Sequence, residues 1–371
     1  MTSAARIKKY GARIGLDIVK VGSAEPFPEY VKTVQDRIQK GLIPPESQQA
    51  ESILKNVELY SDPENSLSQA KSIISLGMRY LLNDKPDHTR PSVPCGRIGR
   101  HLWRDFYGEL WEKKARLVNF LERQGTRCSK EAYLSHKLVA RRAGTGFYGK
   151  NCLIQNENYG SWIVLVSIIT DANLEVDSPA SMNCGSCEAC LRACPTHGIV
   201  APYKLNVGRC INHLLASSNS IPIKLRPSIG NRIDSCDRCQ EVCPNNRNVA
   251  PMRRRFPNPR KKWGISPALI PLLDISTEEF EQSFSDFGFY KKELKFLKRN
   301  AIVALGNTGD PVSLSVLSKM LRNQEGIIRA HAAWAIGRID GSKAKQLLRN
   351  AFRKEKDANV RKEIDNAFGT H

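Results

Sequence analysis

The stretch CGSCEACLRACP, residues 184–195, determines how the sequence around it is interpreted. Its four cysteines follow the spacing Cys-x2-Cys-x2-Cys-x3-Cys-Pro, which matches the bacterial ferredoxin run. In that arrangement the first three thiolates bind one 4Fe–4S cluster and the fourth reaches a second cluster. The spacing therefore predicts a ferredoxin-like domain that holds two clusters.

A second cysteine run follows at residues 236–244, CDRCQEVCP. This run lacks one upstream thiol, which Cys210 can supply, so that eight thiolates serve two clusters. All-thiolate zinc sites are the alternative, but they favour two separated Cys-x2-Cys pairs. We expect the first cluster to be bound by Cys184, Cys187, Cys190 and Cys243, and the second by Cys194, Cys210, Cys236 and Cys239.

The composition limits the classes of protein that remain. A chain of 371 residues with 41% hydrophobic residues predicts two or three folded domains and excludes a wholly disordered protein. The formal charge of +20 favours a polyanionic partner, either a nucleic acid or a membrane surface. The densest apolar run, residues 162–169, is too short to span a bilayer. The first thirty residues lack the apolar stretch of a signal peptide. We expect a soluble, cytoplasmic protein.

Upstream of the cysteines, strand-like and helical patterns alternate. Helices are expected over residues 4–14 and 101–124, and strands over residues 16–24, 71–81 and 161–171. Strands that alternate with helices favour an α/β layer architecture.

The C-terminal 75 residues contain an internal repeat. Ala304-Leu305-Gly306, Ala335-Ile336-Gly337 and Ala367-Phe368-Gly369 recur at intervals of 31 and 32 residues, each with a basic residue upstream. Small residues at fixed helical offsets let paired helices stack, which predicts HEAT-like repeats. A plain helical bundle is the alternative. Those basic residues are Lys298, Arg329 and Arg361, and the last two could satisfy helix ends.

These patterns predict a multi-domain α+β protein of four parts. They are an α/β domain over residues 1–176, a double-cluster ferredoxin-like domain over 177–250, a basic connector over 251–295, and HEAT-like α-helical repeats over 296–371. In the connector, Arg253–Arg255 and Arg260–Lys262 are interleaved with Phe256 and Trp263, a composition that suits phosphate contact with base stacking.

A glycine loop at residues 144–149, GTGFYG, fits the G-x-G-x-x-G pattern of dinucleotide sites. That pattern needs a strand before it and a helix after it. Here a basic helix precedes the loop and an extended segment follows. We therefore expect a loop whose backbone is approached by another large cofactor.

Taken together, several motifs resemble the epoxyqueuosine reductase family from about residue 70 to the end. These motifs are the double cysteine run, RAGTGFYGKNCLI from residue 142, NYGSW from residue 158, IGNRIDSCDRCQEVCP from residue 229 and the terminal repeat. Members of that family are cobalamin-dependent iron–sulfur oxidoreductases, related to reductive dehalogenases, that convert epoxyqueuosine to queuosine in tRNA.

The resemblance implies base-off cobalamin in the N-terminal domain and the tRNA anticodon arm on the helical tail. It also implies a low-potential electron donor such as flavodoxin or ferredoxin. We expect no membrane partner and a monomeric protein. The cobalamin contacts that it implies, many of them through the backbone, are Lys150, Asn151, Ile154, Ser217, Cys236 and Asp237.

The chain differs from the family at the residue that is proposed to donate the proton. The family's aspartate, the proposed proton donor, is Lys130 here, followed by Glu131, and the family's Asp-Tyr-His reads Asp105-Phe106-Tyr107. Glu131, Tyr107 and Lys130 are therefore the candidate proton donors. Two alternatives stay open: a corrinoid and iron–sulfur reductase of another substrate, or a non-catalytic two-cluster electron carrier on a docking scaffold.

Overall fold

The computed structural model describes residues 3–44, 56–83, 93–129, 134–252, 263–288 and 293–368. The chain divides into two compact units, each made of three segments. The first unit contains Met1–Asn83, Asp105–Cys210 and Arg238–Arg253, and the second contains Asp84–Arg104, Ile211–Asp237 and Arg254–His371. Within the described ranges, no helix has the length and apolar character needed to cross a membrane.

The first unit is built on a three-stranded sheet in the order β1-β2-β6. Both neighbouring pairs are antiparallel. The central strand is buried along almost its whole length, which explains its continuous apolar sequence. The strands are β1 (Ile18–Ser23), β2 (Ser72–Arg79) and β6 (Ile163–Thr170).

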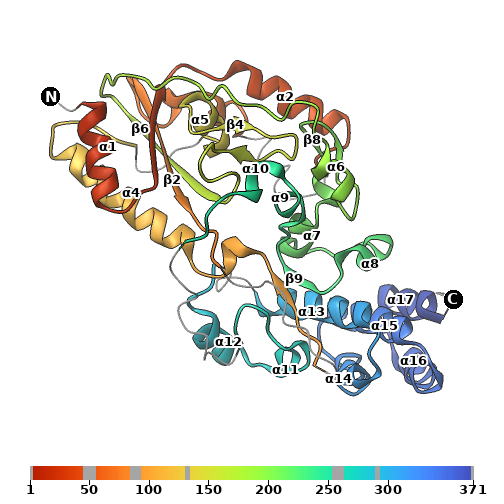
Figure 1. Ribbon diagram of the computed structural model, residues 1–371. Coiled ribbons are helices and arrows are strands. Elements are labelled where there is room, and N and C mark those ends of the chain that lie inside the picture. The colour runs from red at the N-terminus through yellow and green to blue at the C-terminus, as the bar shows by residue number, and fades with distance from the viewer. Residues whose placement is uncertain are drawn as a thin grey trace. The chain divides into compact units, whose positions relative to one another are not determined.

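Helices cover both faces of this sheet (Figure 1). α1 (Ala4–Arg13) and α4 (Phe106–Glu122) lie on one face, and α5 (His136–Arg142) lies on the other. The Asp105 carboxylate begins α4 by accepting a hydrogen bond from the Gly108 amide at 2.9 Å. The helices and strands expected in this half of the sequence are confirmed, within a few residues at their ends.

The first unit also contains shorter elements. They are α2 (Pro28–Gln39), the hairpin β4 (Phe147–Tyr148) and β5 (Ile154–Gln155), α6 (Ala189–Ala193), the hairpin β7 (Ile199–Ala201) and β8 (Lys204–Leu205), α9 (Arg238–Glu241) and α10 (Pro244–Arg247). Two of them, α6 and α9, each hold a cysteine of the two runs. Single 3-10 turns in the two units lie at Leu59–Ser61, Pro63–Asn65, Arg100–Leu102, Val207–Arg209, Ile223–Leu225 and Pro311–Ser313.

The glycine loop joins α5 to the β4–β5 hairpin, so a dinucleotide fold is absent there, as expected. Its glycines serve the protein itself. A Cβ at Gly144 would collide with the Ser178 carbonyl, and one at Gly146 would collide with the Gln155 carbonyl. Chain atoms therefore fill the space that a side chain would take at these two glycines, and the approach of a cofactor to the loop backbone stays a prediction.

The second unit pairs β3 (Arg97–Ile98) with β9 (Arg232–Asp234) in parallel and is otherwise helical. Its last helices form the predicted repeat (Figure 1). α13, α15 and α17 pack side by side because Gly306 lies against Ala335, and Gly337 lies against Ala367. The helices are α7 (Ile211–Ala216), α8 (Arg226–Ile229), α11 (Leu269–Asp274), α12 (Thr277–Phe284), α13 (Leu294–Thr308), α14 (Leu314–Met320), α15 (Gly326–Ile339), α16 (Ser342–Lys354) and α17 (Ala358–Phe368).

The repeated basic residues stabilise helix ends. Lys298 donates to the Ile275 carbonyl at 2.8 Å, Arg329 to the Asn323 carbonyl at 2.8 Å, and Arg361 to the Phe352 carbonyl at 2.9 Å. Each of these carbonyls lies in the last turn of an earlier helix or just beyond it. The side chains therefore satisfy carbonyls that no helical amide reaches.

The basic runs of the connector, Arg253–Arg255 and Arg260–Lys262, lie outside the described residues, as does Phe256. Trp263 is described and is 4% exposed, with its ring 5.6 Å from the ring of Phe284. The expectation that Trp263 offers base stacking is therefore wrong, because this indole fills the core of the second unit.

Candidate cluster and cofactor site

Four of the predicted cluster cysteines line one cavity of the first unit. The cavity has a volume of about 140 Å³. Its thiols come from Cys184, Cys187, Cys190 and Cys243, and Lys150, Asn151 and Gln155 also line it. The structure thus brings together three cysteines of the first run and the last cysteine of the second run.

Local turns place these thiols. The Cys187 amide donates to the Cys184 carbonyl at 3.1 Å, and between them Gly185 adopts a positive φ of 50°. Cys190 lies on α6, and Cys243 is the residue that precedes α10. Because Pro244 fixes the backbone at the first position of α10, the Cys243 side chain is held at the start of this helix.

The electrostatics of the cavity favour a bound cation. Burial raises the pKa of Cys190 to about 11, and the neighbouring Cys243 and Cys184 raise it further. Burial also raises the pKa of Cys243, and again the nearby thiols contribute. Four adjacent thiolates repel one another unless positive charge lies between them.

The donor set fits a four-iron cube, which takes one thiolate for each iron. In the part of the chain that the structure describes, no three histidine, cysteine or carboxylate side chains are grouped to hold a single metal ion.

Lys150 and Asn151, which line the cavity, form a part of its wall that presents hydrogen-bond donors. Asn151 is 5% exposed, and its Oδ1 accepts from the Leu153 amide at 3.2 Å and from Gln155 Nε2 at 3.3 Å. Its Nδ2 is buried and has no partner in the described chain. The Lys150 amide lies 3.4 Å from Cys184 Sγ. Because an unpaired buried N–H is costly, this wall is suited to a bound group with acceptor atoms.

Ile154, another residue expected to contact the cofactor, is a core residue. Its side chain is 3% exposed and packs in one cluster with Ala140 and Leu165. Any contact that Ile154 makes with a cofactor would therefore involve its backbone.

Three of the cysteines expected to bind the second cluster, Cys194, Cys210 and Cys239, lie in the first unit. Cys194 Sγ accepts from the Gly198 amide at 3.2 Å and lies 3.7 Å from Thr196 Oγ1. Burial acts to raise the pKa of Cys194, but these donors outweigh it and lower the pKa. Cys194, one of the expected cluster ligands, therefore ionises more readily than an ordinary cysteine.

Lys137 lies near two of these cysteines, Cys210 and Cys239. Its Nζ donates to the Cys152 carbonyl at 2.9 Å. Burial lowers the pKa of Lys137, while the thiols of Cys152, Cys210 and Cys239 act in the opposite direction. A cation next to these thiols would stabilise their ionised form.

The remaining residues expected to contact a cluster or cobalamin, Ser217, Cys236 and Asp237, lie in the second unit. Asp237 accepts from the Arg100 amide at 2.8 Å and forms an ion pair with its Nη1 at 3.3 Å. Ser217 Oγ accepts from the Asn219 amide at 3.1 Å. The side chains of Asp237 and Ser217 are therefore used to order their own unit.

Of the candidate proton donors, Lys130 and Glu131 lie outside the described residues. Tyr107 is the second residue of α4 and is 44% exposed. Partial burial raises the pKa of Tyr107, so the phenol keeps its proton at neutral pH. Phe106 turns the other way and packs 6.0 Å from the Tyr80 ring. The Asp105-Phe106-Tyr107 motif thus supplies a helix cap, a core ring and a surface phenol.

One polar cluster of the first unit is not predicted by the sequence patterns. Lys114 is 3% exposed, and its Nζ lies 4.3 Å from the centre of the Trp111 ring, whose other neighbour is His136 at 6.5 Å. His136 Nδ1 lies 3.0 Å from Ser167 Oγ. Burial, and then Lys114, lower the pKa of His136 to about 4. The helical spacing of Tyr107, Trp111 and Lys114 is the signal that could have revealed this cluster.

Family models match both the cysteine-rich segment and the C-terminal repeat of this chain. Residues 183–246 match the family model of the 4Fe-4S double cluster binding domain, and residues 292–367 match HEAT repeats. The epoxyqueuosine reductase of Bacillus subtilis is 34% identical over 96% of this chain and 93% of its own. That of Staphylococcus aureus is 31% identical, over 97% and 95%.

Solved structures agree as well. The structure of the Bacillus subtilis enzyme whose catalytic aspartate loop is swung out of the active site has a TM-score of 0.90 and 33% identity, and the match covers 98% of both chains. An epoxyqueuosine reductase with an epoxyqueuosine-modified tRNA stem loop has a TM-score of 0.90 and 32% identity, over 98% of this chain and 97% of the other. The chain, which carries a double 4Fe–4S domain, therefore belongs to the epoxyqueuosine reductase family of oxidoreductases.

Proposed function

We propose that this chain reduces epoxyqueuosine in tRNA to queuosine, with two 4Fe–4S clusters that deliver electrons to a bound cobalamin. The observation that carries the proposal is the cavity that four thiols line together with Lys150 and Asn151, in a chain of this family. The proposed ligands are Cys184, Cys187, Cys190 and Cys243 for one cluster, and Cys194, Cys210, Cys236 and Cys239 for the other.

The reaction sets what the protein must supply. Removal of the epoxide oxygen consumes two electrons and two protons, releases water and leaves a carbon–carbon double bond. Since a 4Fe–4S cluster passes one electron at a time, two clusters in one chain suit this requirement. The chain itself has to hold the clusters, orient the cofactor and provide a proton at the leaving oxygen.

Cobalamin, when bound, supplies a strongly reducing and nucleophilic cobalt centre. We propose that Lys150, Asn151 and Ile154 hold it from the first unit. Lys150 and Asn151 line the same cavity as the four thiols, which supports this, because a cofactor that takes electrons from the cluster has to lie beside it. Cys236, Asp237 and Ser217 remain further contacts implied by the family.

The proton has to come from a group other than the family's aspartate, because Lys130 occupies that position. Tyr107 is our first candidate, since its raised pKa keeps the phenol protonated and its side chain is accessible. Lys130 and Glu131 are the other candidates.

The net charge of +20 supports binding of the tRNA anticodon arm. Arg329 and Arg361 are occupied by carbonyl groups, so other residues of the helical tail must contact phosphates. Exposed basic side chains of α16 are suited to this task, and they are Lys343, Arg349, Arg353 and Lys354. We further propose a flavodoxin or ferredoxin as electron donor, a monomeric protein and a cytoplasmic location.

An anaerobic assay tests the proposal. The protein is reconstituted with iron, sulfide and cobalamin, reduced, and mixed with tRNA that carries epoxyqueuosine, and the released nucleosides are weighed by mass spectrometry. Loss of one oxygen is the expected result. Protein with reducible clusters and bound cobalamin that leaves the nucleoside unchanged would show instead that the lost aspartate marks another substrate.

A further inference from the structure

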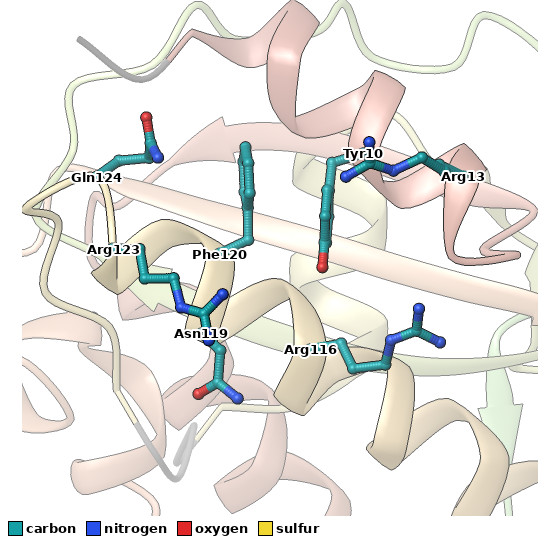
Figure 2. Close-up of a pocket in the computed structure, with 7 residues that line it drawn as sticks. All are labelled: Tyr10, Arg13, Arg116, Asn119, Phe120, Arg123 and Gln124. Atoms are coloured by element: carbon teal, nitrogen blue, oxygen red, sulfur yellow. The ribbon is translucent and has the colours of Figure 1, made fainter.

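A basic groove between α1 and α4 plays no part in the proposed chemistry. It has a volume of about 440 Å³ and lies in the first unit. Tyr10 and Arg13 reach it from α1, and Arg116, Phe120 and Arg123 reach it from α4 (Figure 2). These residues define what we call the α1–α4 groove.

The groove contains an ordered stack of flat groups. The rings of Tyr10 and Phe120 are 4.2 Å apart and inclined by only 10°. The Arg13 guanidinium carbon lies 4.9 Å from the centre of the Tyr10 ring. Figure 2 shows Arg13, Tyr10 and Phe120 in sequence, with Gln124 beyond the far side of Phe120. The stack therefore ends at a ring face that no other aromatic group of the groove covers.

The arginines of the groove carry positive charge that no carboxylate of the described residues neutralises. Arg116 and Arg123 are seven residues apart, two turns of helix, and so lie on the same side of α4. Among the described residues, neither of these guanidinium groups, nor that of Arg13, has a carboxylate within ion-pair distance. Three unpaired cations around an aromatic pair fit a ligand that has both phosphates and a planar ring.

We propose that the α1–α4 groove binds the sugar–phosphate backbone and one unpaired base of the substrate tRNA, apart from the nucleotide that is reduced. This inference rests on the proposed function. The arginines would contact phosphates, and the free face of Phe120 would stack on the base. Asn119 and Gln124, which also line the groove, offer amide groups for hydrogen bonds to it.

The length of α4 allows one tRNA to reach both places. Tyr107 and Phe120 are thirteen residues apart on this helix, which corresponds to about 20 Å along its axis. A folded tRNA is longer than this. The RNA that presents its modified base near the start of α4 can therefore also contact the groove near its end.

An acidic electron-donor protein is the competing partner, and the fold disfavours it. Cys190 on α6 and Cys243 before α10 line the cluster cavity. Figure 1 shows α6 and α10 on the other side of the β1–β2–β6 sheet from α1 and α4. Since an electron donor must come close to a cluster, the α1–α4 groove is poorly placed for it.

The test compares two charge-matched variants of the reconstituted full-length protein. Arg116→Gln/Arg123→Gln removes two positive charges from the groove, and Lys32→Gln/Lys71→Gln removes two from exposed sites outside it. The Kd for full-length tRNA is measured by fluorescence anisotropy over a series of NaCl concentrations. We expect the groove variant to bind about tenfold more weakly and its salt slope to fall by about 2, with the control close to wild type.

A Phe120→Leu variant separates stacking from charge. It should weaken binding and leave the salt slope unchanged, because stacking releases no counterions. Equal tRNA affinity in the groove and control variants, with normal reduction by the wild type, would overturn the groove alone. Slower reduction of the clusters by ferredoxin or flavodoxin in the groove variant, with unchanged tRNA affinity, would assign the groove to the electron donor. A wild-type protein that neither binds nor reduces tRNA would overturn the proposed function itself.

Discussion

Arg226 and Glu363 form a two-point ion pair in the second unit, with 2.7 Å between Nη2 and Oε1 and 3.0 Å between Nη1 and Oε2. The Arg226 side chain is fully buried, and its Nε also donates to the Ile221 carbonyl at 2.8 Å. The pair joins α8 to the last helix of the repeat. A buried guanidinium has no water to replace a lost carboxylate.

Glu363→Gln is therefore expected to lower the free energy of unfolding by about 3 kcal/mol. Chemical denaturation of the reconstituted protein, followed by circular dichroism, measures this change. Glu281→Gln, at an exposed position of α12, is the matched control and should change stability by less than about 0.5 kcal/mol. Equal stability of the two variants would show that Arg226 tolerates the loss of its partner.

The stability of the second unit should fall in mild acid because of His331. This histidine is fully buried; Nε2 accepts from the Ile221 amide at 3.3 Å, and Nδ1 lies 2.7 Å from the Ile327 carbonyl. Burial, and then Arg226, lower the pKa of His331 well below its usual 6.5. The unfolded chain therefore binds a proton that the folded chain refuses, so stability is complete above pH 6.5 and declines below it.

At pH 5 the loss from His331 alone should be about 2 kcal/mol relative to pH 7.5. Thermal unfolding at the two pH values measures the total pH effect. A His331→Gln variant, although less stable, should show a smaller difference between the two pH values than the wild type. An unchanged difference would mean that other groups cause the acid sensitivity.

The cysteine assignment predicts how iron content responds to mutation. Cys194→Ser should abolish one cluster and leave the other, so that iron falls from about eight atoms per chain to about four. Iron and sulfide analysis after anaerobic reconstitution measures this change. Cys128→Ser, at a cysteine outside both runs, should retain all the iron. An iron content unaffected by Cys194→Ser would contradict the assignment.

Asn151 should influence the cluster that its cavity holds. Replacement by Leu removes the buried Nδ2 donor and should make the reduction potential of this cluster more negative, since hydrogen bonds to cluster sulfur stabilise the reduced form. One such bond corresponds to a shift on the order of 40 mV. A redox titration followed by electron paramagnetic resonance gives the value, and Asn158→Leu on an exposed turn is the control.

Tyr107→Phe should lower kcat for epoxyqueuosine about 100-fold and leave KM for tRNA unchanged, if the phenol supplies the proton. Single-turnover assays with reduced protein measure the chemical step. Trp111→Phe, one turn further along α4, is the control for packing. A Tyr107→Phe variant with wild-type turnover would transfer the role to Glu131 or Lys130, to be tested as Glu131→Gln and Lys130→Met.

The sequence predicts the elements of this fold better than their arrangement. Apolar periodicity identified β2 and β6, but alternation of strands with helices does not reveal direction, and both pairs in the sheet are antiparallel. The small residues around Gly306 and Gly337 predicted stacked helices correctly, because only a short side chain permits that approach. Local patterns thus identified the helices, and the small residues within each helix predicted where neighbouring helices pack closely.

The features that the sequence did not reveal depend on residues far apart in the chain. Trp263 follows a basic run, yet the core contact with Phe284 decides its position. The cluster of Lys114, His136 and Ser167 needs two helices and a strand to meet. The grouping of Cys243 with Cys184, in contrast, was predicted from cysteine spacing. Each 4Fe–4S cluster takes four thiolates, so the ferredoxin spacing and the number of cysteines were sufficient for this prediction.

The division of the first unit into three segments has a consequence for synthesis on the ribosome. The chain passes from one unit to the other five times, and the last segment of the first unit ends at Arg253. Cys184 therefore emerges long before Cys243, which completes its cavity. Iron delivered to the nascent chain finds an incomplete set of thiols until that last segment is made, so cluster insertion has to follow translation of the whole first unit.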